Sequence, residues 1–200
     1  MVETIHLAHT PPELALHVAV YTDVENASFL KEQLLAGNAE FEYAFIDASM
    51  ILSTKHVLAA AFRAMNDYLN ERLKSRNIHS EIVFCLSPNN NIGEAFRRFG
   101  VSESTRNLVV LKVATTPDIT LENVSQHLST HIQGKECDFD DASFRKISDV
   151  DRIRKVYKAN LPTSSSKDGK AVNGTSDREF DPIWSLERQV LGLMALRGAT

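Results

Sequence analysis

The chain has 200 residues, of which 43% are hydrophobic and 24% charged, and its formal net charge is −4 at pH 7. This length and composition predict one soluble globular domain that buries a sizeable core, and they argue against a fibre or a repeat array. Because nucleic-acid-binding domains of the bulk electrostatic kind are usually strongly basic, any RNA contact is expected to be local.

The sequence carries no sign of membrane insertion or secretion. Its apolar runs are shorter than the roughly 20 residues that a membrane-spanning helix needs, and its N-terminus lacks the regions of a signal peptide. We therefore expect an intracellular protein with no membrane partner. The two cysteines, Cys85 and Cys137, have neither a CxxC spacing nor a histidine at metal-ligand spacing. The pattern indicates neither a disulfide framework nor a zinc site, and Cys85 is interpreted as a small core residue.

The first half of the chain alternates between strand and helix patterns. The predicted elements are strands at residues 15–21 and 41–46 and helices at residues 24–35 and 54–74. Gly37 follows the first helix as its stop, and Ser53 is the expected N-cap of the second. The second helix has an apolar face that includes Val57, and Lys55 lies on its other side.

Residues 81–101 (EIVFCLSPNNNIGEAFRRFGV) contain the sharpest local signals. The β-branched and aromatic run at residues 81–86 stops at a proline, which predicts a third strand. Asn91 stands three residues before Glu94, and this spacing predicts a reciprocal capping box at a helix start. Gly100 is expected to adopt the left-handed conformation just after that helix. The inward face of the predicted helix consists of Ile92, Ala95, Phe96 and Phe99.

The second half begins with a predicted strand at residues 107–113, followed by a helix from Leu121 that ends near Gly134. Residues 144–158 keep helical spacing and carry six basic residues against two acidic ones. Residues 161–182 are rich in small polar residues and are predicted to form a flexible loop. The last helix, residues 183–196, has more apolar surface than one core face needs.

Four strands separated by helices predict an α/β (α+β) fold, in which helices surround a small four-stranded sheet within one domain spanning residues 1–200. The alternation by itself suggests parallel strands joined by helical crossovers. A split arrangement with antiparallel neighbours fits the same pattern, and periodicity does not choose between them.

The sequence contains no recognisable catalytic constellation. Phosphate-binding, dinucleotide-binding, zinc-protease, hydrolase and protein-kinase motifs are all absent from it. His127 and His131 lie four residues apart with no matching third ligand, so surface imidazoles are the expected explanation. We predict no catalytic residue, no cofactor and no metal. The turn at residues 87–91 could bind an anion at a helix N-terminus, but capping geometry is the favoured interpretation.

The basic run at residues 144–158 leaves two interpretations open. A row of charged residues on an amphipathic helix is usually a solvent-exposed face. The alternative, more specific interpretation is a patch that contacts an RNA backbone. The apolar surplus of the last helix is more often core than interface, although exposed apolar patches tend to mark partner-binding sites.

The stretch LSPNNNIGEAFRRFGVSESTRNLVVLKV, residues 86–113, resembles the central motif of the TPRKB (PRPK-binding protein) family. Members of this family are the small non-catalytic subunit of the KEOPS, or EKC, complex. Further segments resemble the family in the same order, at residues 45–48, 50–53, 56–64, 153–158 and 195–198. The pattern is most similar to fungal members, and it departs from the family in the length of residues 162–181.

The resemblance implies an accessory subunit rather than an enzyme. Its partners would be the atypical small kinase/ATPase subunit of KEOPS and, indirectly, the subunit that transfers threonylcarbamoyl to adenosine 37 of tRNA. The family also implies help in recruiting tRNA through its 3′ CCA end, a link of fungal members to telomere maintenance, and a location in nucleus and cytoplasm. Its fold has a small, largely antiparallel sheet, which favours the split arrangement.

Two sets of site residues follow from their places in family-like segments. The expected tRNA-binding residues are Lys55, Arg154, Lys158 and Arg197. The expected partner-binding residues are Asn89, Asn90, Asn91, Ile92 and Phe96. A protein-binding adaptor of a small kinase with no RNA contact is the alternative function.

Overall fold

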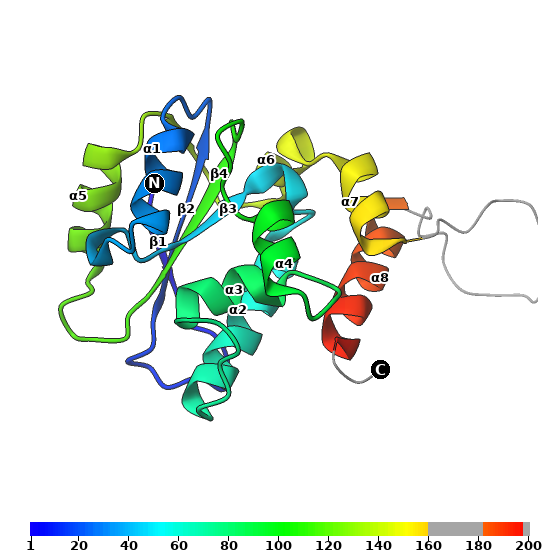
Figure 1. Ribbon diagram of the computed structural model, residues 1–200, viewed down its shortest axis with the longest axis horizontal. Helices are drawn as coiled ribbons and strands as arrows, with labels where there is room; N and C mark the ends of the chain where they lie inside the picture. Colours follow the sequence, from blue (N-terminus) through cyan, green and yellow to red (C-terminus); the bar gives the residue numbers. More distant parts are fainter. Residues whose placement is uncertain (160–181, 198–200) are drawn as a thin grey trace, which may run out of the picture.

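A computed structural model describes residues 1–159 and 182–197 of the chain (Figure 1). An antiparallel sheet of five strands in the order β1-β2-β4-β3 lies at its centre, with β5 also paired to β2. The strands are β1 (Glu3–Ile5), β2 (Leu16–Thr22), β3 (Ala44–Asp47), β4 (Leu108–Val113) and β5 (Lys135–Cys137). The central pair runs from Leu16 opposite Val113 to Tyr21 opposite Leu108.

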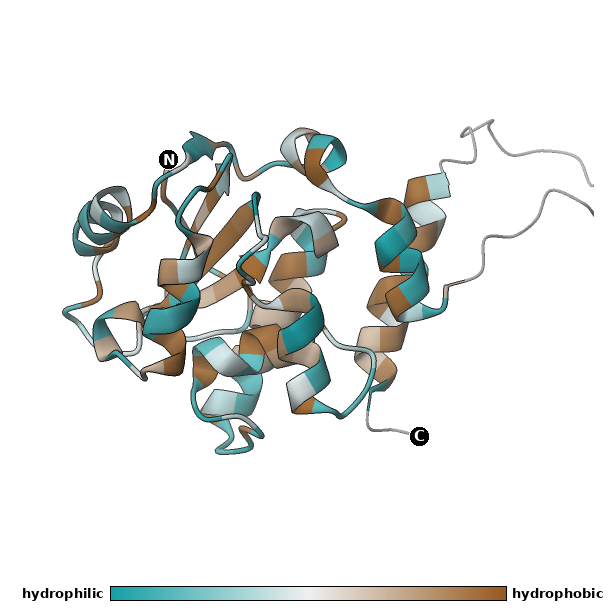
Figure 2. Ribbon diagram, turned by 45° about the horizontal axis from the view of Figure 1, so that its top comes forward, coloured by the Kyte–Doolittle hydropathy of each residue, from teal (hydrophilic) through white to brown (hydrophobic). Residues whose placement is uncertain are grey.

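Helices cover both faces of this sheet, so nearly every residue of β2 and β4 is buried. Successive side chains point to opposite faces. Val18 and Val20 belong to one apolar cluster, whereas Ala19 and Tyr21 belong to the other. Apolar shades accordingly run along the strands in Figure 2.

The two faces are covered by different helices (Figure 1). The helices are α1 (Ala27–Leu35), η1 (Ala39–Phe41), η2 (Ala48–Met50), α2 (Thr54–Leu69), α3 (Ile78–Cys85), α4 (Ile92–Phe99), α5 (Leu121–His131), α6 (Asp141–Ile147), α7 (Val150–Tyr157) and α8 (Pro182–Leu196). Buried residues of α1 and α5 join the smaller cluster, and those of α2, α3, α7 and α8 join the larger one. None of the described helices is both long and apolar enough to cross a membrane.

The predicted fold class is confirmed, and the antiparallel pairing agrees with the arrangement implied by the family resemblance. The strand predicted at residues 81–86 is wrong, because this segment belongs to α3. Asn77 caps that helix by accepting a hydrogen bond from the Ser80 N–H at 2.8 Å. Residues 81–86 are all buried, the charged Glu81 included, so the run has no exposed face whose polar residues would reveal a helical period. Cys85 is a buried core residue, as predicted.

Several predicted boundaries also change. The Ser53 cap of α2 is confirmed, but the helix ends at Leu69, before Glu71 with its positive φ of 54°. Residues 144–158 divide into α6 and α7, and Ser148 lies between them. Gly100 is extended, with φ of −72°, rather than left-handed. The predicted loop at residues 161–182 lies outside the described residues, apart from Pro182, which begins α8.

Candidate partner-binding surface

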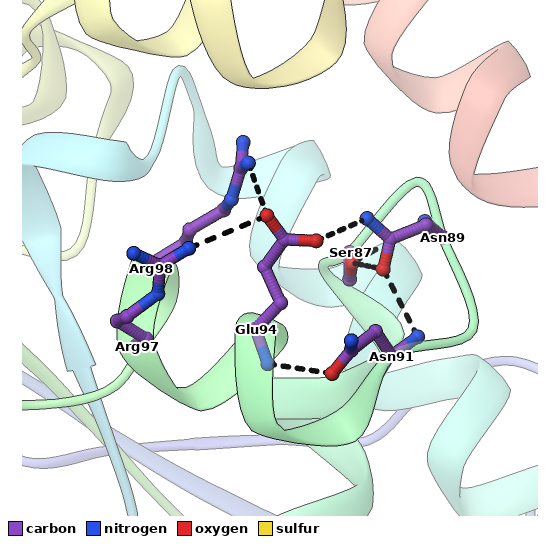
Figure 3. A network of polar contacts seen from close by, with 6 residues as sticks. All are labelled: Ser87, Asn89, Asn91, Glu94, Arg97 and Arg98. Atoms are coloured by element: carbon purple, nitrogen blue, oxygen red, sulfur yellow. Dashed lines mark hydrogen bonds and ion pairs between the residues drawn. The ribbon is translucent and has the colours of Figure 1, made fainter.

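The loop before α4 is held by hydrogen bonds among its own side chains (Figure 3). The Ser87 hydroxyl donates to Asn89 Oδ1 at 3.2 Å, and the same amide oxygen accepts the Asn91 N–H at 3.0 Å. Asn91 Oδ1 then accepts the Glu94 N–H at 2.9 Å and caps the helix. These contacts fix the loop without any outside ligand, which supports capping geometry over an anion site.

Glu94 differs from the predicted capping box. Its carboxylate accepts a hydrogen bond from Asn89 Nδ2 at 2.9 Å and pairs with Arg98 one turn later (Figure 3). The Asn91 N–H that the box would have used is bound by Asn89 instead. Arg98 and Asn89 lower the pKa of Glu94, so the carboxylate stays ionised and braces the loop against α4.

The outer side of α4 carries apolar surface that its own packing does not bury. Ala95 and Phe99 face the core and are fully buried, whereas Ile92 is 37% exposed and Phe96 is half-buried. Asn90 and Asn91 are exposed beside Ile92. We use the name α4 surface for Asn89, Asn90, Asn91, Ile92 and Phe96. An exposed isoleucine beside a half-buried phenylalanine on a rigidly capped helix suits protein docking.

A buried polar relay supports this loop from behind. The Leu52 N–H donates to His56 Nδ1 at 3.3 Å, so the proton of the neutral ring lies on Nε2, which is 2.9 Å from the Tyr157 hydroxyl. That hydroxyl donates to the carbonyl of Leu86, where the loop begins. Burial lowers the pKa of His56 to about 3, so the ring is neutral. The sequence does not reveal this relay, because its members come from distant segments.

The hydrogen bond between His56 of α2 and Tyr157 of α7 joins two helices that lie at or beside three of the expected tRNA-binding residues. Lys55 is exposed in the first turn of α2, next to His56, and Lys158 is exposed directly after Tyr157. Arg154 lies one turn earlier on α7, where it is half-buried and pairs with Asp151 at 3.3 Å. The start of α2 and the end of α7 are therefore joined through the buried His56–Tyr157 hydrogen bond.

Arg197, the fourth expected tRNA-binding residue, is only 5% exposed. Its guanidinium donates to the Phe84 carbonyl and to Cys85 Sγ, and it stacks on the Phe84 ring at 4.0 Å from the ring centroid. Arg63 donates to the carbonyls of Met194 and Arg197. Arg197 thus anchors the end of α8 to α3, a position that leaves its charge inside the protein.

The expectation of surface imidazoles on α5 is wrong. His127 and His131 are half-buried, with ring centroids 4.5 Å apart, and both rings pack against Phe41. His127 stacks on Tyr43, whose hydroxyl lies 3.1 Å from Nδ1. Burial and the neighbouring His131 lower the pKa of His127. The pair belongs to an aromatic packing cluster that joins α5 to η1 and to the residue before β3.

Within the described parts of the chain, Asp67, Glu81 and Cys85 place potential metal-ligand atoms within 4.8 Å of one another. Donors already contact two of these three residues: Cys85 Sγ accepts from Arg197, and Glu81 Oε2 accepts from the Ser75 N–H at 2.7 Å. Burial raises the pKa of the Cys85 thiol to about 11, so the thiolate that a metal needs is disfavoured.

Comparison with known proteins gives one consistent result. Residues 21–198 match the family described as kinase binding protein CGI-121. The chain is 54% identical to the EKC/KEOPS complex subunit cgi121 of Aspergillus terreus, over 99% of this chain and 97% of that protein. It is 50% identical to the subunit of Coccidioides immitis, over 100% of this chain and 99% of that protein. Its identity to the Schizosaccharomyces pombe subunit is 36%, over 76% of this chain and 86% of that protein. The chain therefore belongs to the CGI-121 family of kinase binding proteins.

Proposed function

We propose that this protein is a non-catalytic subunit of the EKC/KEOPS complex, and that it binds the small atypical kinase/ATPase subunit. The observation that carries the proposal is the family match over residues 21–198, together with relatives of that name along nearly their whole length. Under this proposal the protein works in the nucleus and cytoplasm, with a contribution to telomere maintenance.

The kinase contact is assigned to the α4 surface. Exposed Ile92 and half-buried Phe96 supply an apolar centre, and the hydrogen-bonded asparagine loop supplies a polar rim. This composition is typical of interface cores and rims. The loop is preorganised, so little ordering entropy is lost on binding.

Co-purification of the chain with its kinase subunit tests this assignment. Ile92→Asp is expected to weaken capture by about tenfold or more, because it buries an unpaired charge at the contact. The matched control is Leu121→Asp, which changes a leucine of similar exposure (42%) on α5. Equal capture by both variants would place the kinase contact elsewhere.

We further propose that the protein helps to recruit tRNA through its 3′ CCA end, at the basic surface formed by Lys55, Arg154 and Lys158. Single-stranded RNA ends need only stacking and a few phosphate contacts, so a protein with net negative charge can bind one. Arg197 is left out of this surface, because its guanidinium is buried against Phe84.

A gel-shift comparison separates this function from its alternative, an adaptor without RNA contact. Intact tRNA should bind more tightly than tRNA lacking CCA, and the Lys55→Glu, Lys158→Glu double variant should lose that difference. Lys135→Glu serves as the control, since Lys135 is exposed on β5. Equal binding of both tRNAs by the wild-type chain would favour the adaptor.

A further inference from the structure

A cleft of about 610 Å³ opens on the side of α4 that faces α1. Phe41, Phe45, Val83 and Phe96 line its interior, and Leu34 and Leu35 line its wall. Of these side chains, Leu35 is 78% exposed, while Phe41 and Phe45 are buried. The size is that of cavities that enclose several large side chains of a ligand.

The charged residues that line this cleft are mostly cationic. They are Lys31 on α1, Arg76 in the loop before α3, Arg97 on α4, and one acid, Glu42. Exposed Arg97 is 3.5 Å from Glu94, and Lys31 pairs with Glu103 at 2.9 Å. These exposed ion pairs are weak, so both cations can exchange partners.

Arg76 is placed over the cleft by the backbone of Gly37. Gly37 has a φ of 70°, and a Cβ added there would lie 3.2 Å from the Arg76 guanidinium. The absence of a side chain at this position therefore gives the guanidinium its room. The single acid, Glu42, has its Oε1 3.8 Å from buried His79 Nδ1. His79 lowers the pKa of Glu42 most, and Lys112 and Arg76 lower it further.

We propose that this cleft binds an acidic amphipathic peptide segment of a partner protein. Apolar side chains of the segment fill the interior, and its carboxylates pair with Arg76 and Arg97. The apolar floor and the cationic rim together match a helix or turn with an apolar stripe flanked by Asp or Glu. This site goes beyond the proposed kinase contact and shares only Phe96 with it.

The polar groups of the cleft disfavour a nucleic acid as the occupant. Asn38 donates to Gln33 at 2.8 Å and accepts from the Glu40 N–H at 3.1 Å, so its amide is occupied. The Asn77 oxygen caps α3. Bases would also need open ring faces to stack on, but Phe41 and Phe45 are only 3% and 1% exposed. The chemistry therefore favours a peptide.

Fluorescence anisotropy with the full chain tests the proposal. The probe is a labelled 16-residue peptide with Leu or Phe at i, i+3, i+4 and i+7 and Glu at the flanking positions. One control peptide has the same composition with the stripe scrambled, and another has Lys in place of Glu. The probe should bind about tenfold more tightly than either control, because only it offers both the stripe and the charge.

Variants assign the binding to the cleft. Arg76→Glu combined with Arg97→Glu should weaken binding of the probe by about tenfold or more. Lys74→Glu is the matched control, since Lys74 is an exposed cation two residues from Arg76 that does not line the cleft. Leu35→Asp tests the apolar wall at a position too exposed to disturb folding. Circular dichroism and thermal unfolding verify that each variant is folded.

Three results would overturn the proposal. The first is equal binding of the striped and scrambled peptides. The second is unchanged binding by the folded arginine double variant. The third is displacement of the probe by a short single-stranded RNA ending in CCA, with loss of RNA binding in the Arg76→Glu, Arg97→Glu variant, which would make the cleft an RNA site.

Discussion

Arg197 brings a charge into the interior at the end of α8, where its guanidinium contacts α3. The guanidinium satisfies the Phe84 carbonyl, contacts Cys85 Sγ and covers the Phe84 ring. Deleting a buried charged donor leaves the acceptor without a partner, which costs more than the hydrogen bond was worth. The residue is therefore expected to act on stability first.

Truncation of this residue gives the prediction at the residue scale. Arg197→Ala should lower the free energy of unfolding by about 2–3 kcal/mol, from the lost charged hydrogen bonds and the stacking contact. Arg188→Ala is the matched control, because Arg188 also lies over an aromatic ring, exposed Trp184, at 4.8 Å, and should cost less than about 1 kcal/mol. Urea unfolding of both variants measures the difference, and two equally small losses would contradict the anchoring role.

Hydroxyl removal tests the relay that joins α2, α7 and the loop before α4. Tyr157→Phe should cost about 1–3 kcal/mol, because it leaves both His56 Nε2 and the Leu86 carbonyl without their partner. Tyr21→Phe provides the comparison, since the buried Tyr21 hydroxyl makes only a long contact of 3.4 Å with Glu136. The urea midpoints of the two variants should differ clearly; similar midpoints would argue against the relay.

Helix α4 ends at Phe99, and Gly100 follows it at the point where the chain pairs with β3. A Cβ at this position would lie 2.7 Å from the Phe96 carbonyl oxygen, and the next residue bonds to β3 through the Val101 N–H and the Phe45 carbonyl at 3.0 Å. The glycine is thus required by close approach rather than by a left-handed conformation.

Two glycine substitutions test this reason at the scale of the element. Gly100→Ala should destabilise the protein by about 1–3 kcal/mol, because the backbone around Phe96 has to move. Gly192→Ala should instead stabilise it by about 0.5–1 kcal/mol, because this glycine lies within α8 with nothing within 4 Å of the added Cβ. Thermal unfolding of the pair should show shifts of opposite sign; a neutral Gly100→Ala would contradict the steric argument.

The sequence predicted correctly those features that depend on residues close together in the chain. The Asn91 and Ser53 caps depend on neighbours three residues away, and both are confirmed. The strand prediction for the α3 segment is wrong because a fully buried helix shows no alternation of polar and apolar residues. Strands β1 and β5 were not predicted, because each is only three residues long and too short to show a pattern. At the candidate site, the exposure of Ile92, the burial of Arg197 and the cleft beside Gly37 depend on contacts between distant segments. The spacing of residues along the sequence does not indicate contacts between segments that are far apart in the chain.

For the whole molecule, the buried histidines determine how stability varies with pH. Burial lowers the pKa of His56 to about 3 and also lowers the pKa of His79, below the ordinary value of 6.5. The unfolded chain therefore binds more protons than the folded one below pH 6.5. Stability is complete above that pH and is lost as the pH falls, by about 1.4 kcal/mol per pH unit for each fully shifted histidine.

Between pH 7 and pH 5, His56 alone should therefore cost the protein about 2 kcal/mol of unfolding free energy. His56→Gln keeps a polar side chain opposite Tyr157 but cannot titrate, so this variant should be less stable at pH 7 and lose about 2 kcal/mol less than the wild type on acidification. Urea unfolding of both proteins at pH 7, 6 and 5 measures the two slopes. Parallel slopes would mean that protonation of His56 does not drive the acid sensitivity, and that the interior tolerates a charged ring beside Tyr157.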